Sequence, residues 1–143
     1  MGEVKFYRDD KDISFEAPHS GDAGWDLRTP KEFVLHPKEA KLIPLGLYLE
    51  IPMGFVGIIK DRSSMAKLKI FTAGGVIDRS YRGEIIVCLR NDSEELVKFE
   101  RGQKIAQIVI LRCYQDDAFE VEFLSDLAKS ERATGGFGST GKF

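Results

Sequence analysis

Asp78 is one candidate catalytic residue of this chain. It is a single carboxylate in a polar stretch between two apolar segments. Gly74 and Gly75 precede it, and glycines let a backbone bend sharply or approach another group closely. Tyr81 follows three residues later. The same pattern is also typical of an ordinary turn, in which Asp and Ser side chains bond to nearby backbone. The stretch alone therefore leaves a catalytic and a structural interpretation open.

The second candidate is the glycine-rich stretch from Arg132 to Phe143. Glycines free backbone N–H groups to turn toward an anion, and Ser139 and Thr140 add hydroxyl donors. Arg132 adds a planar cationic group that suits phosphate. Phe137 is an aromatic ring that suits stacking on a nucleobase. The stretch predicts phosphate and ring binding, against the alternative of a glycine-rich tail without function.

One motif within this stretch is rejected. Residues 136–142 nearly match the P-loop pattern G-x-x-x-x-G-K-[ST], but Phe143 stands where Ser or Thr is required. The hydroxyl of that position is needed for Mg²⁺, and the loop must open a helix that presents its N-terminus to the phosphates. We therefore do not expect a P-loop nucleotidase.

The composition indicates one folded domain. The chain has 143 residues, of which 43% are hydrophobic and 31% charged, and its net charge is −2. Without a long basic run, direct nucleic-acid binding is not expected. No segment approaches the run of about 18 apolar residues that spans a membrane. With no signal-peptide pattern either, we expect a cytoplasmic or nuclear protein in which Cys88 and Cys113 are buried, reduced thiols.

Hydrophobic patterning predicts many short strands broken by Gly and Pro, and hence an all-β sandwich or barrel. The segment 62–69 is the one helix candidate, with Ser63 or Ser64 as its N-cap. Residues 74–89 are expected to form a β-hairpin with a long polar loop. Residues 1–130 are expected to form one domain, followed by a flexible tail over residues 131–143. Strands are predicted at 4–8, 33–35, 45–51, 55–59, 96–99, 105–111 and 119–123.

Five stretches in fixed order resemble the motifs of the homotrimeric dUTPase family. They cover most of the chain, and it is their order and spacing that make the resemblance specific. The five stretches are Ala23–Leu27, Arg62–Ala66, Gly75–Gly83, Arg101–Gln107 and Arg132–Gly141.

The resemblance implies a jelly-roll-like β-sandwich or distorted barrel with one short helix and a flexible glycine-rich tail. It implies a homotrimer with three active sites, each drawing residues from all three subunits. The implied reaction is Mg²⁺-assisted hydrolysis of dUTP to dUMP and pyrophosphate. Such a dUTP diphosphatase limits uracil incorporation into DNA and supplies dUMP for thymidylate synthesis.

The resemblance also implies the site residues. Asp78 would activate the water that attacks the α-phosphorus, and Asp26 would hold a water bound to Mg²⁺, with no direct protein ligand on the metal. His19 and His36 form no nucleophile–base pair, which fits direct attack by water. Uracil and deoxyribose would be bound by Gly75, Val76, Ile77, Asp78, Tyr81 and Phe137, and the phosphates by Arg62, Ser63, Ser64, Gln107, Arg132, Gly138, Ser139 and Thr140.

Two positions depart from the family pattern. Lys104 stands where the family often has Arg, which keeps the charge but loses the bidentate geometry. Ala133 stands where the tail motif usually has Gly, which stiffens the tail. Two other functions remain open: a dCTP deaminase of the same fold, which would lack such a tail, and a regulatory protein that uses the nucleotide pocket as a switch for a partner.

Overall fold

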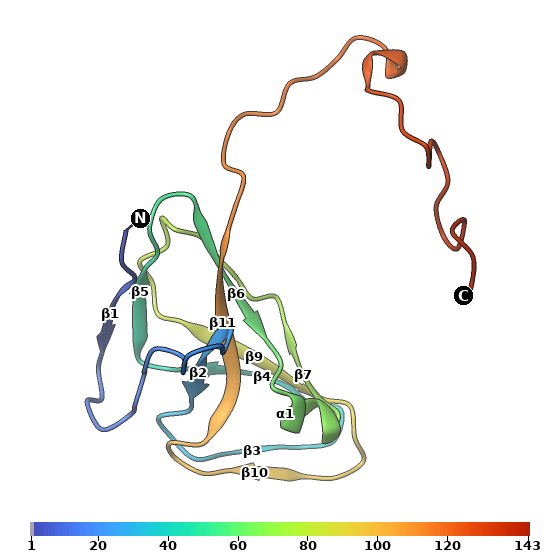
Figure 1. The fold of residues 1–143 in the computed structure, drawn as a ribbon. Coiled ribbons are helices and arrows are strands. Elements are labelled where there is room, and N and C mark those ends of the chain that lie inside the picture. The colour runs from blue at the N-terminus through green and yellow to red at the C-terminus, as the bar shows by residue number, and fades with distance from the viewer. Residues whose placement is uncertain (1) are drawn as a thin grey trace.

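The computed structural model describes residues 2–143, and nearly all of its regular structure is short β-strand (Figure 1). One α-helix of five residues and one short 3₁₀-helix accompany the strands within this range. The elements are β1 (Lys5–Arg8), β2 (Gly24–Arg28), β3 (Phe33–Leu35), β4 (Ala40–Pro44), β5 (Leu47–Glu50), β6 (Phe55–Lys60), α1 (Ser63–Lys67), β7 (Ile70–Ala73), β8 (Val76–Ile77), β9 (Ile86–Asn91), β10 (Val97–Phe99), β11 (Lys104–Arg112) and the 3₁₀-helix Leu124–Asp126.

The strands pair antiparallel in several small sheets. The largest has the order β2-β11-β6-β8, and a second has the order β4-β9-β7. Two further pairs, β1 with β5 and β3 with β10, complete the body. Because β11 lies between β2 and β6, it fixes segments that are about 80 and 50 residues earlier in the chain.

One hydrophobic core holds these sheets together. Leu47 and Leu49 of β5 point inward and alternate with more exposed neighbours, which is the period-2 pattern of a strand with one buried face. Ile105, Ala106 and Ile108 of β11 are fully buried in the same core. The predicted all-β fold with one short helix is confirmed. No helix among residues 2–143 has the length and apolar character needed to cross a lipid bilayer.

The predicted hairpin over residues 74–89 is wrong. β8 pairs with β6 in the larger sheet, whereas β9 pairs with β4 and β7 in the other sheet. The polar stretch between Ile77 and Ile86 therefore crosses from one sheet to another. Local sequence indicates that two strands flank a loop, but partner choice depends on contacts distant in sequence, which the local pattern does not contain.

The predicted strand at 119–123 is also wrong. After β11 the chain is still bonded to the start of β6 through Cys113 and Gln115, and it then leaves the body and runs apart from the strands (Figure 1). Phe119 and Phe123 alternate with acidic residues as expected, but both are exposed. A strand needs a partner for its backbone groups, and this segment finds none among the described residues of its own chain.

The two cysteines are free thiols, as predicted, but their expected burial is only partly right. Cys88 in β9 is half-buried, whereas Cys113 is exposed because it follows β11 where the chain leaves the core.

Asn91 is a buried polar residue whose side chain forms a hydrogen-bond network inside the core. Its buried side-chain amide donates to the carbonyl oxygens of Leu35 and Glu95 (3.1 and 2.8 Å), and its Oδ1 accepts from the backbone and hydroxyl of Ser93 (3.0 and 2.7 Å). Asn91→Ala leaves several polar groups without partners and should lower the unfolding free energy by about 2–4 kcal/mol. Urea denaturation at fixed protein concentration measures this. Ser93→Ala, which removes one hydroxyl, should cost less than half as much, and equal losses would contradict this role of Asn91.

Candidate active site

The register of the largest sheet brings three polar residues into one row. Gln107 of β11 lies opposite Asp26 of β2 on one side and Lys60 of β6 on the other. Opposed residues on neighbouring strands carry their side chains on the same face of the sheet. The chain then continues from β6 into Asp61 and Arg62, directly before α1, so the predicted phosphate-binding segment begins at the end of this row.

Asp26 is flanked by two cations. Its Oδ1 lies 3.2 Å from Nε of Arg62, and its Oδ2 lies 3.0 Å from Nζ of Lys104. The side chains of Asp26 and Arg62 keep 39% and 30% of their exposure, so the pair is reachable from solvent. Asp26 therefore orients Arg62, and the cluster carries a net positive charge that suits an anion.

Gln107 fixes the backbone of the same segment. Its Nε2 donates to the carbonyl oxygen of Asp61 (2.9 Å), one residue before Arg62. Gly24 of β2 makes room for this side chain, because a Cβ there would lie 2.9 Å from Oε1 of Gln107. The polar Gln107 within an apolar strand thus has a partner in its own chain, and its predicted contact with phosphate stays a prediction.

The predicted cap of the helix is wrong in detail. α1 begins at Ser63, its N-cap residue is Arg62, and no side-chain hydrogen bond caps it. The backbone carbonyl of Arg62 accepts from the N–H groups of Met65 and Ala66 (3.0 and 3.1 Å). Ser63 and Ser64 lie in the first turn, where both are exposed, and Oγ of Ser64 accepts from Nη1 of Arg62 (3.4 Å). The Ser64 hydroxyl therefore lies beside the guanidinium.

Asp78 and Tyr81 line a separate hollow at the end of β8. Gly75 lets β8 approach β6 closely, since its φ is +104° and a Cβ would lie 3.1 Å from the Ile59 carbonyl oxygen. The N–H of Ile59 donates to the Gly75 carbonyl (2.8 Å). The hollow is lined by Val76, Ile77, Asp78, Tyr81, Glu84 and Ile86.

Tyr81 is held in one orientation. Its hydroxyl donates to the Glu84 carbonyl oxygen (2.8 Å), and its ring lies across Gly83. A Cβ at position 83 would lie 2.4 Å from the Tyr81 oxygen, which no real contact allows. Gly83 is therefore required for this orientation of the ring, which forms one wall of the hollow.

The two groups of site residues do not meet within one chain. Ile77, next to Asp78, pairs with Gly57, which is three residues before Lys60 on β6. At a strand rise of about 3.3 Å per residue, that is roughly 10 Å along the strand. The group around Asp26 also lies across β6 and β11 from β8. One subunit therefore presents two half-sites on different parts of its surface.

The tail residues lie apart from both groups. Phe137 is fully exposed, and Gly138, Ser139 and Thr140 are exposed beside it. Hydrogen bonds join tail residues to one another, including Nε of Arg132 to the Gly135 carbonyl (2.7 Å). Ala133 has φ of +48°, a left-handed conformation that favours glycine. Ala133, which departs from the family pattern, therefore occupies a backbone conformation that glycine adopts with less strain.

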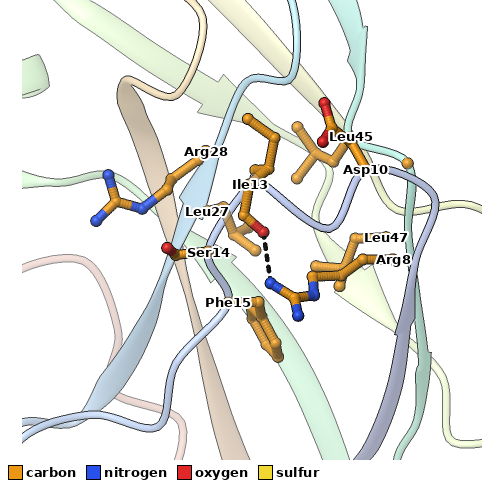
Figure 2. A pocket seen from close by; sticks show the side chains of 10 residues that line it. Arg8, Asp10, Ile13, Ser14, Phe15, Leu27, Arg28, Leu45 and Leu47 are labelled. Atoms are coloured by element: carbon orange, nitrogen blue, oxygen red, sulfur yellow. Dashed lines mark hydrogen bonds between the residues drawn. The ribbon is translucent and has the colours of Figure 1, made fainter.

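A second hollow, between β1 and the core, has a different character (Figure 2). The Arg8 guanidinium reaches across it and donates to the Ile13 carbonyl (2.8 Å), beside the ring of Phe15. The lining also includes Leu27, Leu45 and Leu47. None of the predicted site residues lies there, and the arginine ties the loop after β1 to the body.

Two residues near the site were missed by the sequence analysis. Lys104 was noted only as a departure from the family pattern, but it pairs with Asp26. Asp61 gave no signal, since it stands alone before Arg62, yet its Oδ1 accepts from the backbone N–H of Thr72 (2.7 Å). Within residues 2–143 no group of three or more His, Cys, Asp and Glu residues is arranged to hold a metal.

Comparison with known proteins identifies the family of this chain. The family model for dUTPase matches residues 11–141. The deoxyuridine 5′-triphosphate nucleotidohydrolase of Corynebacterium glutamicum is 39% identical over 99% of this chain and 97% of its own. That of an Anaeromyxobacter species is 45% identical over 85% and 83%.

Two solved structures share the fold. The dUTPase of Staphylococcus bacteriophage 80alpha, with dUpNHpp, is 26% identical with a TM-score of 0.88, covering 99% of this chain and all of its own. The EIAV dUTPase is 28% identical with a TM-score of 0.75, covering 84% and 97%. The similarity confirms the predicted jelly-roll-like fold. Since the family model spans nearly the whole sequence and the relatives match along most of their length, the chain belongs to the dUTPase family.

Proposed function

We propose that this protein is a dUTP diphosphatase, which hydrolyses dUTP to dUMP and pyrophosphate. A water oxygen bonds to the α-phosphorus while the bond from that phosphorus to the bridging oxygen of the β-phosphate breaks. The supporting observation is that one surface of the subunit carries a cationic group around Arg62 and another carries the hollow with Asp78 and Tyr81, and that the dUTPase family model spans both.

Catalysis requires a homotrimer in this proposal. The two half-sites of one subunit lie on different parts of its surface, so in this proposal Asp78 of one subunit faces Arg62 of another. The segment after β11 supports assembly, because Phe119, Phe123, Leu124 and Leu127 are all exposed. Apolar surface of this extent is buried in soluble proteins by contact with another chain. The tail from residue 131 then closes over a site of a neighbouring subunit.

The hollow after β8 binds the nucleoside. Backbone groups of Gly75, Val76 and Ile77 read the uracil edge, because the glycine lets the chain approach a flat base closely. Tyr81 packs on the deoxyribose, and its fixed ring leaves no room for a 2′-hydroxyl. Phe137 of the tail stacks on the other side of the base, which buries a ring that is otherwise fully exposed.

The cationic group binds the triphosphate. Arg62 and the exposed hydroxyls of Ser63 and Ser64 in the first turn of α1 contact phosphate oxygens. Gln107 holds this segment through its hydrogen bond to the Asp61 carbonyl. Arg132 and the tail residues Gly138, Ser139 and Thr140 close on the outer phosphates.

Magnesium fits this site as a partner of the substrate. Asp26 is a lone carboxylate beside Arg62 and Lys104, which does not make a protein cage for the ion but leaves an acceptor for a metal-bound water. Bound Mg²⁺ would neutralise phosphate charge in the transition state. Asp26 is thus placed to orient the hydrated ion and Arg62 together.

Asp78 activates the water. Its carboxylate is exposed in the hollow and can accept a proton while it holds the water in line with the leaving pyrophosphate. Closure of the tail excludes bulk water from the site during this step.

The function is tested by measuring pyrophosphate release from each deoxynucleoside triphosphate and from UTP. The proposal requires release from dUTP with strong preference over dTTP and UTP. Ammonia from dCTP would instead identify a deaminase, and nucleotide binding without turnover would identify a regulatory role.

Asp78→Asn should lower kcat by about 10²- to 10⁴-fold, because the amide cannot take the proton. Affinity for a non-hydrolysable imido analogue of dUTP, measured by calorimetry, should change little, because shape and most hydrogen bonds are kept. Turnover at the wild-type rate would exclude Asp78 as the base.

Truncation after Ser130 should abolish most activity, because the nucleotide can no longer be enclosed, while size-exclusion chromatography still shows a trimer. Mixing this variant with Asp78→Asn by unfolding and refolding tests shared sites. If the tail and Asp78 come from different subunits, random assembly restores roughly a quarter of the sites. A mixture that stays inactive would mean that both come from one subunit, and a monomeric full-length chain would refute the shared site altogether.

Gly83→Ala should weaken discrimination between dUTP and UTP by about 10-fold or more, because a Cβ displaces the Tyr81 ring from the sugar. The ratio of the two kcat/KM values measures this. Ser80→Ala changes an exposed residue of the same loop and serves as the matched control. Unchanged discrimination in Gly83→Ala would show that the ring orientation does not select the sugar.

A further inference from the structure

Asp61 joins three elements that lie far apart in the sequence. It follows the last residue of β6 and precedes Arg62, the N-cap of α1. Its side-chain Oδ1 accepts from the backbone N–H of Thr72 in β7 (2.7 Å). Its own carbonyl oxygen accepts from Nε2 of Gln107 in β11 (2.9 Å).

These two hydrogen bonds restrain residue 61 from both sides. One acts on the side chain and the other on the backbone carbonyl, so the residue can neither rotate nor shift without breaking one of them. Asp61 is half-buried and both bonds are partly shielded, which strengthens them relative to bonds in water. The peptide that leads into Arg62 is therefore held rigidly against β7 and β11.

Arg62 depends on this restraint. Its backbone is extended (φ −84°, ψ 144°), and its carbonyl starts the hydrogen bonds of α1. Its guanidinium lies 3.2 Å from Asp26 of β2, which is anchored to the other side of β11. Since α1 has only five residues and no side-chain cap, the helix itself cannot set the position of Arg62.

We infer that Asp61 is a positioning residue of the reaction, which acts through Arg62 by hydrogen bonding its own side chain to β7. This inference rests on the proposed function. Asp61 contacts neither nucleotide nor metal in it. What the side chain supplies is an acceptor for the Thr72 N–H, and its negative charge is not required. β7 also runs into Gly74 and Gly75, so the same bond ties the phosphate-binding segment to the strand that leads to the nucleoside hollow.

The test compares three substitutions by their steady-state kinetics with dUTP. Asp61→Ala removes the acceptor and should lower kcat/KM by about 10- to 100-fold. The loss should appear mainly as a raised KM, because Arg62 contacts the phosphates before and during the reaction. Asp61→Asn keeps the acceptor and should remain within about 3-fold of wild type, since a neutral acceptor suffices. Asp61→Glu keeps the charge but displaces the acceptor, and should resemble Asp61→Ala.

A purely structural role would give a different result. It would lower the amount of folded trimer, and so kcat, with KM unchanged, and it would lower the melting temperature in step with activity. That pattern would overturn the inference, as would equal losses in Asp61→Asn and Asp61→Ala, which would mean that the charge matters. If Asp61→Ala fails to fold, the comparison of Asp61→Glu with Asp61→Asn still decides. Asp12→Ala, an exposed aspartate far along the chain, is the control.

A double substitution tests whether Asp61 acts through Arg62. Adding Asp61→Ala to Arg62→Ala should lower kcat/KM no further than Arg62→Ala alone, and independent losses would overturn the inference. Binding of inorganic tripolyphosphate, measured by calorimetry, separates this inference from the proposed reaction. If the wild type binds it and Asp61→Ala binds it about 10-fold more weakly, the positioning role stands even where no pyrophosphate is released from dUTP. Equal binding by both would refute it.

Discussion

The central position of β11 is the constraint on which the rest of the structure depends. This strand buries Ile105, Ala106 and Ile108 in the core and keeps one amide, Gln107, opposite Asp26. Pairing with β2 and β6 then delivers a carboxylate from one side and the start of the Arg62 segment from the other. A shift of one residue in this pairing would turn Gln107 to the opposite face and break its hydrogen bond to the Asp61 carbonyl. The hydrophobic pattern of β11 therefore fixes the polar cluster as firmly as it fixes the core.

Under the proposed function, the separation of the two half-sites makes activity a property of the assembly. A folded subunit has an intact cationic group and an intact nucleoside hollow, yet neither alone encloses a triphosphate. Phe119 and Phe123 lie on a segment that has left the body, so the free subunit exposes apolar surface that association would bury. In the proposed trimer the same contacts that stabilise the quaternary structure complete the site. Dilution would then reduce activity and stability together.

Much of this was readable from sequence, and the failures have a common cause. Alternation in β5 and the apolar run of β11 predicted strands correctly, because burial on one face leaves a local pattern. The hairpin over 74–89 and the strand at 119–123 failed because strand pairing is decided by partners outside the local window. The motifs located Arg62 and Asp78, whereas the roles of Lys104 and Asp61 arise only when β2, β7 and β11 meet. The spacing of residues along the chain does not predict these contacts between strands.

The hydroxyl of Tyr81 is already committed to the Glu84 carbonyl, and this has a consequence for how sugars are distinguished. Under the proposed function, the ring would meet the nucleotide as a flat wall, with its hydroxyl turned away toward Glu84 of its own loop. Such a wall excludes a 2′ substituent by its size and offers it no hydrogen bond. Under the proposed function, acceptance would follow the size of the 2′ substituent: fluorine, close to hydrogen in bulk, passes, the hydroxyl is hindered, and an O-methyl group is refused.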